Sequence, residues 1–164
     1  MIKTAALMVF LAAAAPAWAC NPDLFQQLDT SASGEPDFSL DVAERASTEG
    51  GEWRVWKQGA NAVTEAVRID YGEMGRFETR LVFQTERAYA ITQTTYRYGV
   101  PIFVEGSMTV RVETDIYMFC EGDLLLPPAE FGVDPDYVQG AETARSAFLA
   151  PEIADWVPIS LQRP

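Results

Sequence analysis

The sequence predicts an α+β, mainly β domain: an antiparallel meander of five or six strands with a C-terminal amphipathic helix packed on one face. Three observations predict this fold. Apolar and polar side chains alternate with a period of two from Gly50 onward. The alternating stretches are separated by short connectors, which favour antiparallel neighbours. After Pro127-Pro128 the spacing of apolar residues becomes that of a helix.

The strands are predicted one by one from this alternation. The first, Phe38 to Ala46, is the least regular, because Ala43 to Ala46 is also compatible with a helix. One face of each strand is expected to pack inward, while the other faces water. The remaining predicted strands are residues 52–55, 63–71, 77–83, 88–98 and 110–120, and a tight turn at 121–122 leads to an apolar stretch at 124–126.

The helix has clear start and stop signals. Asp134 is the expected N-cap, and Pro135 suits the first helical position. Apolar residues follow helical spacing from Tyr137 to Leu149, and Pro151 is expected to stop the helix. Such a helix beside a sheet with one apolar face covers that face.

The first residues read as an export signal. Lys3 provides a positive charge, Ala5 to Ala15 is an apolar stretch too short for a membrane span, and Ala17-Trp18-Ala19 fits a cleavage site. No transmembrane segment is expected after cleavage. The predicted organisation is a signal peptide at 1–19, a short helix and linker at 20–37, and a single domain at 38–164.

The two cysteines, Cys20 and Cys120, fit an oxidising compartment. In an exported chain they most simply form one disulfide, which would close a loop of about 100 residues. The alternative is a lipid anchor on Cys20, although Ala17 and Trp18 match an acylation signal poorly. The expected location is therefore the periplasm of a Gram-negative bacterium or the medium, with anchoring through Cys20 as the alternative.

Composition excludes several classes of function. The formal net charge of −12 disfavours nucleic acid as a partner. The chain has no histidine, so it offers no Ser-His or Cys-His catalytic pair and no histidine-ligated metal site. We expect no cofactor.

Acidic side chains are the remaining candidates for catalysis. A hydrolase acting on envelope glycans could use two carboxylates, one of them with a raised pKa. Calcium is the natural metal for such a chain, but a helix cap explains Asp134 and Asp136, and a turn explains Glu121 and Asp123. We expect neither catalytic nor metal-binding residues among them. The carboxylate pairs considered are Glu49 with Glu52, Asp70 with Glu73, and Glu113 with Asp115.

Aromatic residues are the best candidates for binding. Tyr96, Tyr98 and Phe103 surround a Gly/Pro loop, with Arg97 between the two tyrosines. Tyr117 and Phe119 are expected on the outward face of their strand, where they would extend a partner or ligand surface. The alternative is that the helix or the N-terminal segment covers these aromatics and makes a second small core.

Short motifs between residues 47 and 126 resemble a loose group of uncharacterised bacterial exported proteins and lipoproteins. The motifs are Ser47-Thr48-Glu49-Gly50-Gly51-Glu52, then Tyr96-Arg97-Tyr98, Pro101-Ile102, and the strand end from Tyr117 to Gly122. The resemblance implies a β-hairpin meander in an extracytoplasmic bacterial setting, and it implies no activity, ligand or catalytic residue.

These observations together predict a non-enzymatic, exported binding or interaction module whose partner is another protein or an envelope component. A carboxylate-based hydrolase and a lipid-anchored structural protein of the envelope are the two alternatives. The sequence leaves the oligomeric state open.

Overall fold

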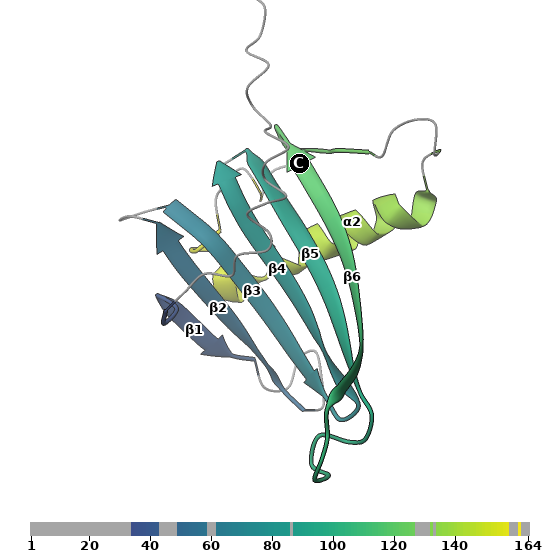
Figure 1. The fold of residues 1–164 in the computed structure, drawn as a ribbon. Helices are drawn as coiled ribbons and strands as arrows, with labels where there is room; N and C mark the ends of the chain where they lie inside the picture. Colours follow the sequence, from purple (N-terminus) through teal and green to yellow (C-terminus); the bar gives the residue numbers. More distant parts are fainter. Residues whose placement is uncertain are drawn as a thin grey trace, which may run out of the picture.

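An antiparallel sheet carries the fold, and one helix crosses one of its faces (Figure 1). The computed structural model describes residues 34–42, 49–58, 62–85, 87–126, 132, 134–157 and 161. The predicted signal peptide, the predicted short helix at Asn21 and the residues at 43–46 lie outside the described residues. Cys20 lies outside them as well.

Seven strands follow one another in the sheet in the order in which they occur in the chain. Each pairs antiparallel with the next, which confirms the predicted meander. The number exceeds the predicted five or six because the two-residue β7 is too short to show an alternating pattern. The strands are β1 (Phe38–Asp41), β2 (Gly51–Gln58), β3 (Ala62–Gly72), β4 (Gly75–Thr85), β5 (Ala88–Tyr98), β6 (Thr109–Cys120) and β7 (Asp123–Leu124).

Two tight turns join neighbouring strands, and the one at Glu121-Gly122 was predicted from the sequence. Glu73 and Met74 connect β3 to β4. Glu121 and Gly122 connect β6 to β7, and both have positive φ angles, 54° and 94°. Two successive residues in the left-handed region are typical of the hairpin turns that match the twist of antiparallel strands.

The main core lies between the sheet and the helix, on what we call the helix face. Strand register places Val55, Ala66, Leu81, Ile91 and Tyr117 in one row across β2 to β6 on this face. All five are buried. Because their side chains lie on one side of the sheet, a single covering element is enough to remove them from water.

That covering element is α2 (Pro135–Ala147), which contacts β5. Asp134 caps it as predicted, since its carboxylate accepts a hydrogen bond from the Asp136 N–H at 2.9 Å. The helix ends at Ala147, slightly before the predicted end at Leu149. The buried Phe148 follows it, with its ring centroid 5.6 Å from that of Trp53. A short 3-10 helix, η2 (Pro151–Ile153), then places Ile153 and Val157 in the same core.

The opposite side of the sheet, the reverse face, differs from the predicted wet surface. In β3 the larger apolar side chains Val67 and Ile69 lie on this face and are buried, while Arg68 lies on the helix face. The buried Glu65 and Arg80 also belong to the reverse face. The predicted alternation with a period of two is therefore present in β3, but the expectation that one face is simply wet was wrong.

Candidate functional site

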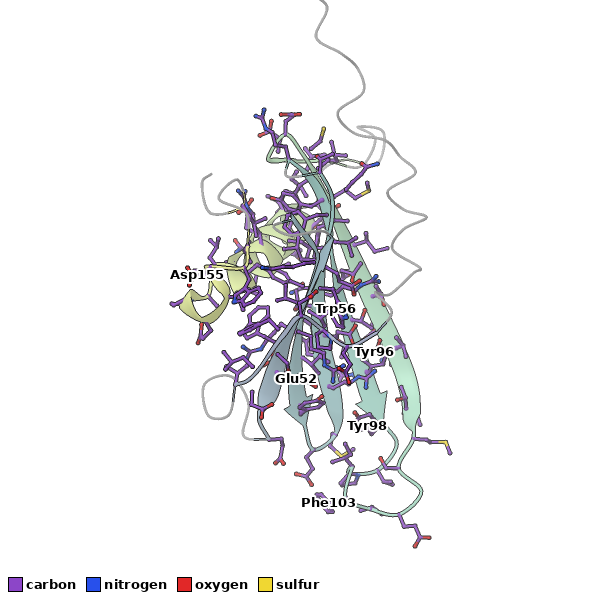
Figure 2. The ribbon with its side chains drawn as sticks, turned by 90° about the vertical axis from the view of Figure 1, so that its left-hand side faces the viewer. Glu52, Trp56, Tyr96, Tyr98, Phe103 and Asp155 are labelled. Atoms are coloured by element: carbon purple, nitrogen blue, oxygen red, sulfur yellow. The ribbon has the colours of Figure 1, made fainter. Side chains whose placement is uncertain are left out.

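Four of the six predicted binding residues lie together at one end of the sheet. Tyr96, Arg97 and Tyr98 end β5, and Phe103 lies in the loop that follows (Figure 2). The Arg76 guanidinium lies over the Tyr96 ring, 4.1 Å from its centroid. Phe103 is 75% exposed. These four residues thus lie at the same end of the sheet, with Tyr96 and Arg97 on opposite faces of β5, and their role in binding stays a prediction.

The other two predicted binding residues lie in the core, which corrects their expected outward orientation. Tyr117 and Phe119 are 5% and 1% exposed on the helix face. The Phe119 ring stacks on Tyr89 at 4.8 Å between centroids, and the Tyr117 ring lies 5.1 Å from that of Tyr137 in α2. Their strand has apolar residues on both faces, so its alternation does not tell which face the helix covers.

The loop from Gly99 to Met108 and the neighbouring β3–β4 turn present a cluster of exposed apolar side chains that we call the apolar tip. Its two most exposed members are Phe103 and Met108, at 75% and 67%. Large apolar residues gathered at a loop end mark an interaction surface more often than scattered ones do. The apolar tip consists of Met74, Val100, Ile102, Phe103, Val104 and Met108.

Hydrogen bonds within the loop hold the apolar tip in one shape. The N–H of Val104 donates to Pro101 O at 2.9 Å, and the N–H of Ser107 donates to Val104 O at 3.1 Å. The Ser107 hydroxyl donates to Val100 O at 3.1 Å. At the base of the loop, the Gly99 N–H donates to Met108 O at 3.0 Å. A partner would therefore meet a preformed surface.

The neighbouring β3–β4 turn is joined to this loop. The N–H of Ile102 donates to Glu73 O at 3.0 Å, and the N–H of Tyr98 donates to Met74 O at 2.9 Å. These bonds bring Met74 beside the loop, so the apolar tip is continuous across two hairpin ends. The exposed carboxylates of Glu73 and Glu105 flank it.

An open hollow of about 370 Å³ adjoins the apolar tip. Two arginines, Arg76 and Arg97, contribute to its wall, and the carboxylate of Asp70 in the same wall accepts from Arg68 Nη2 at 2.6 Å. The Nε atom of Arg76 is buried without a hydrogen-bond partner among the described residues. The hollow is lined by Asp70, Tyr71, Gly72, Met74, Gly75, Arg76, Phe77, Thr95, Tyr96 and Arg97.

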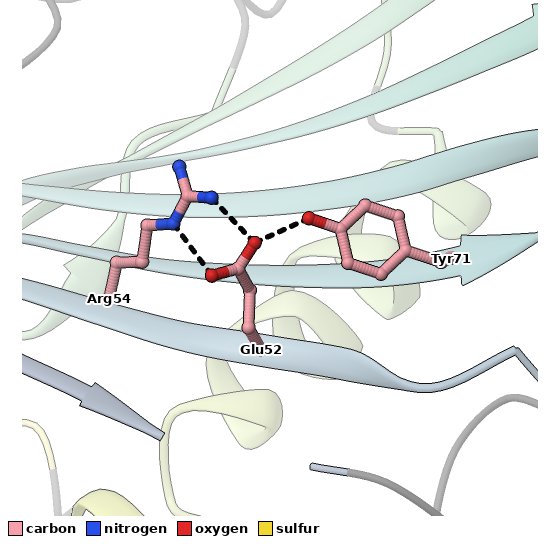
Figure 3. Close-up of polar contacts among 3 residues, drawn as sticks. All are labelled: Glu52, Arg54 and Tyr71. Atoms are coloured by element: carbon pink, nitrogen blue, oxygen red, sulfur yellow. Dashed lines mark hydrogen bonds and ion pairs between the residues drawn. The ribbon is translucent and has the colours of Figure 1, made fainter. Parts of the chain in front are cut away.

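Glu52 is fixed beside the hollow by two neighbours (Figure 3). Arg54 donates to it through Nη2 at 2.6 Å and through Nε at 2.8 Å, and the Tyr71 hydroxyl donates to the same carboxylate. The hydrogen bonds from Arg54 hold the pKa of Glu52 below its usual value of 4.5. Burial, followed by the bond to Glu52, raises the pKa of Tyr71. Glu52 is thus a fixed anion, the opposite of a proton donor at neutral pH.

In each carboxylate pair considered from the sequence, one member binds an arginine. Arg68 binds Asp70, Arg54 binds Glu52 and Arg111 binds Glu113, each two residues away along the same strand. Glu49 and Asp115 are exposed. Among the described residues, no group of three or more acidic or cysteine side chains could hold a metal ion, and no helix is long and apolar enough to span a membrane.

Sequence reasoning missed most of the apolar tip. Ile102, Val104 and Met108 stand in a Gly/Pro loop, and large apolar side chains in such a loop were the available signal. Met74 offered no signal, because its place beside the loop depends on hydrogen bonds between hairpins distant in sequence.

Comparison with known proteins found no matching family model, no matching curated protein and no matching solved structure.

Proposed function

We propose that this protein is an exported, non-enzymatic binding module that engages another protein through its apolar tip. The carrying observation is the preformed loop that exposes Phe103, Ile102 and Met108 together. Exposing such side chains to water is unfavourable, and burying them against a partner stabilises the complex by about 25 cal/mol per Å² of apolar area. A loop already held in shape loses little conformational entropy on binding.

The charge around the apolar tip indicates the chemistry of the partner. Glu73 and Glu105 flank the apolar side chains, Arg76 and Arg97 line the adjoining hollow, and the whole chain carries a net charge of −12. A partner with an apolar groove bordered by lysine or arginine therefore fits best. The same charges oppose insertion into an anionic membrane, which favours a protein over a lipid surface.

The two alternative functions draw less support from the described residues. For a hydrolase, Glu52, Asp70 and Glu113 are each bound by an arginine of their own strand, which leaves these carboxylates paired rather than directed at a substrate. For a lipid anchor, Cys20 lies outside the described residues. Neither a hydrolase nor a lipid-anchored structural protein would give the exposed apolar tip a function.

The proposal can be tested by site-specific photocrosslinking in cells that export the protein. A photoreactive residue at position 103 should give a discrete crosslinked partner, whereas the same residue at position 149, an exposed leucine outside the apolar tip, should not. The purified partner should bind the wild-type chain, and the double variant Ile102→Ser/Phe103→Ser should weaken binding at least about tenfold, or about 1.4 kcal/mol.

The matched control is Leu149→Ser, which removes an exposed apolar side chain elsewhere and should leave the affinity unchanged. Equal binding by the double tip variant would contradict the proposal. Binding to neutral lipid vesicles that the tip variant abolishes, with no crosslinked protein, would replace the protein partner by a membrane.

A further inference from the structure

Strand β6 has an open edge along most of its length. The short β7 pairs with its last two residues, Phe119 and Cys120. No strand in the described part of the chain pairs with the same side of residues 109–116, and all eight are exposed. An exposed edge with free backbone groups is a ready template for pairing with another strand.

Hydrogen bonds at the far end of β6 show which backbone groups point to this edge. The Met118 carbonyl accepts from the Leu125 N–H at 2.8 Å, so even-numbered residues of the strand face away from β5. By the two-residue period, Val112 and Thr114 direct their N–H and C=O groups to the open side. The Ile116 carbonyl accepts from the Tyr137 hydroxyl at 3.2 Å, and this contact closes the open stretch at that end.

The side chains around Val112 form a self-complementary pattern. Arg111 and Glu113 flank it on the helix-face side of the strand, and both are exposed. In an antiparallel pair of two copies centred on Val112, Arg111 of each copy lies opposite Glu113 of the other. Opposite charges in directly facing positions stabilise a strand pair, whereas like charges destabilise it.

Neighbouring registers lack this match. A pair centred on Glu113 places that carboxylate opposite its own copy, and a pair centred on Thr114 places Glu113 opposite Asp115. If the two-fold axis fell between two residues, even-numbered residues of one copy would face odd-numbered residues of the other. Backbone N–H and C=O groups that point to the open edge would then face groups that point toward β5, and no ladder could form. The charges therefore select the pairing centred on Val112, where the two valines also meet on the reverse face.

We propose that two copies of this chain associate edge to edge through β6, antiparallel, with the two-fold axis at Val112. The interface is isologous, because each copy supplies the same residues. The register shift at Val110 limits the regular part of the edge to residues from Arg111 onward, so the regular pairing about Val112 spans Arg111 to Glu113. Each chain also carries a net charge of −12, and the association is therefore weak. This interface is separate from the apolar tip and does not depend on the proposed function.

Sedimentation equilibrium of the whole exported chain, from about 1 to about 200 µM, tests the proposal. A monomer–dimer equilibrium is expected in that range. Arg111→Glu and Glu113→Arg should each raise the dimer Kd at least about tenfold, because each sets like charges opposite one another. Mixing the two variants should restore association as a heterodimer, and the double variant Arg111→Glu/Glu113→Arg should restore the homodimer.

A backbone test complements the charge test. Val112→Pro removes an N–H that points to the open edge and leaves the β5–β6 ladder intact, so it should abolish the dimer in a folded chain. Val112→Thr, which keeps the N–H, is the matched control and should dimerise. A chain that stays monomeric at about 200 µM overturns the proposal. A dimer that survives Arg111→Glu, or that is lost in Ile102→Ser/Phe103→Ser, overturns it as well, since the interface would then lie elsewhere.

Discussion

Arg80 and Glu65 form the most deeply placed ion pair among the described residues. They are 7% and 5% exposed, and Arg80 donates through Nε to one carboxylate oxygen at 2.7 Å and through Nη2 to the other at 3.3 Å. Removing charges from water is costly, and the two-pronged contact across β3 and β4 offsets that cost. Each residue therefore stabilises the fold mainly by pairing with the buried charge of the other.

We predict that Arg80→Met destabilises the fold by about 3 kcal/mol, because it leaves the Glu65 carboxylate buried without this partner. The double variant Glu65→Leu/Arg80→Met should recover much of the loss, since neither charge of this pair remains. Urea unfolding of the three chains measures both effects. A double variant as unstable as the sum of its two single changes would contradict this account.

The buried hydroxyl of Tyr89 leads to a prediction of pH dependence. It has no hydrogen-bond partner among the described residues, and burial raises the pKa of Tyr89 to about 12 from 10.0. A raised pKa in the folded state means that the stabilising contribution of the neutral phenol is complete below pH 10. It is lost as the pH rises through about 12.

Tyr89→Phe should therefore unfold less steeply between pH 10 and about 12 than the wild-type chain. At neutral pH the variant should be as stable or more stable by about 1 kcal/mol, because a buried polar group without a partner is removed. Thermal unfolding at stepped pH values, followed by circular dichroism, measures both expectations. A variant with unchanged alkaline unfolding would show that Tyr89 does not control it.

At the scale of elements, local chemistry made the strands, the turns and the helix predictable. The turn at Glu121-Gly122 and the cap at Asp134 are decided by residues within a few positions, so a single sequence contains them. The burial of Tyr117 was not predictable in this way. It depends on which face α2 covers, and β6 carries apolar side chains on both faces.

The candidate site was partly predictable for the same reason. Tyr96 and Phe103 stand out in the sequence as aromatics around a Gly/Pro loop. The placement of Met74 beside Ile102 depends on contacts between hairpins that are distant in sequence, and outside the site the pairing of Glu65 with Arg80 likewise depends on strand register. Register across several strands depends on the whole set of pairings, which alternation in one strand does not determine.

Gly140 in α2 provides a test of how closely the helix approaches the sheet. A Cβ at this position would overlap the Tyr117 hydroxyl oxygen and lie 3.1 Å from Cζ of the same ring. Gly140→Ala should therefore destabilise the fold, although alanine is favoured over glycine in a free helix by about 1 kcal/mol. Adding Tyr117→Phe, which removes that oxygen, should recover part of the loss in chemical denaturation. Stabilisation by Gly140→Ala alone would contradict the close approach.

At the scale of the whole molecule, the predicted Cys20–Cys120 bridge would tie the N-terminal segment to the sheet. Cys120 is the half-buried last residue of β6, and none of the described cysteines is free. Because Cys20 lies outside the described residues, the pairing stays a prediction.

If the bridge forms, reduction should lower the free energy of unfolding by up to about 4.7 kcal/mol, the chain-entropy value for a loop of about 100 residues. Guanidinium unfolding with and without reductant measures the difference. The variant Cys20→Ser/Cys120→Ser should match the reduced chain and should no longer respond to reductant. Two thiols titrated in the unreduced, unfolded wild type would contradict the bridge.

The sequential strand order affects how the chain can fold while it is being synthesised from its N-terminus. Each new strand finds the strand that emerged just before it, so the sheet can extend hairpin by hairpin without waiting for distant sequence. The apolar helix face of that growing sheet stays exposed until α2, near the end of the chain, has been synthesised. A nascent chain halted before Asp134 should therefore attract chaperones, whereas the completed chain should not.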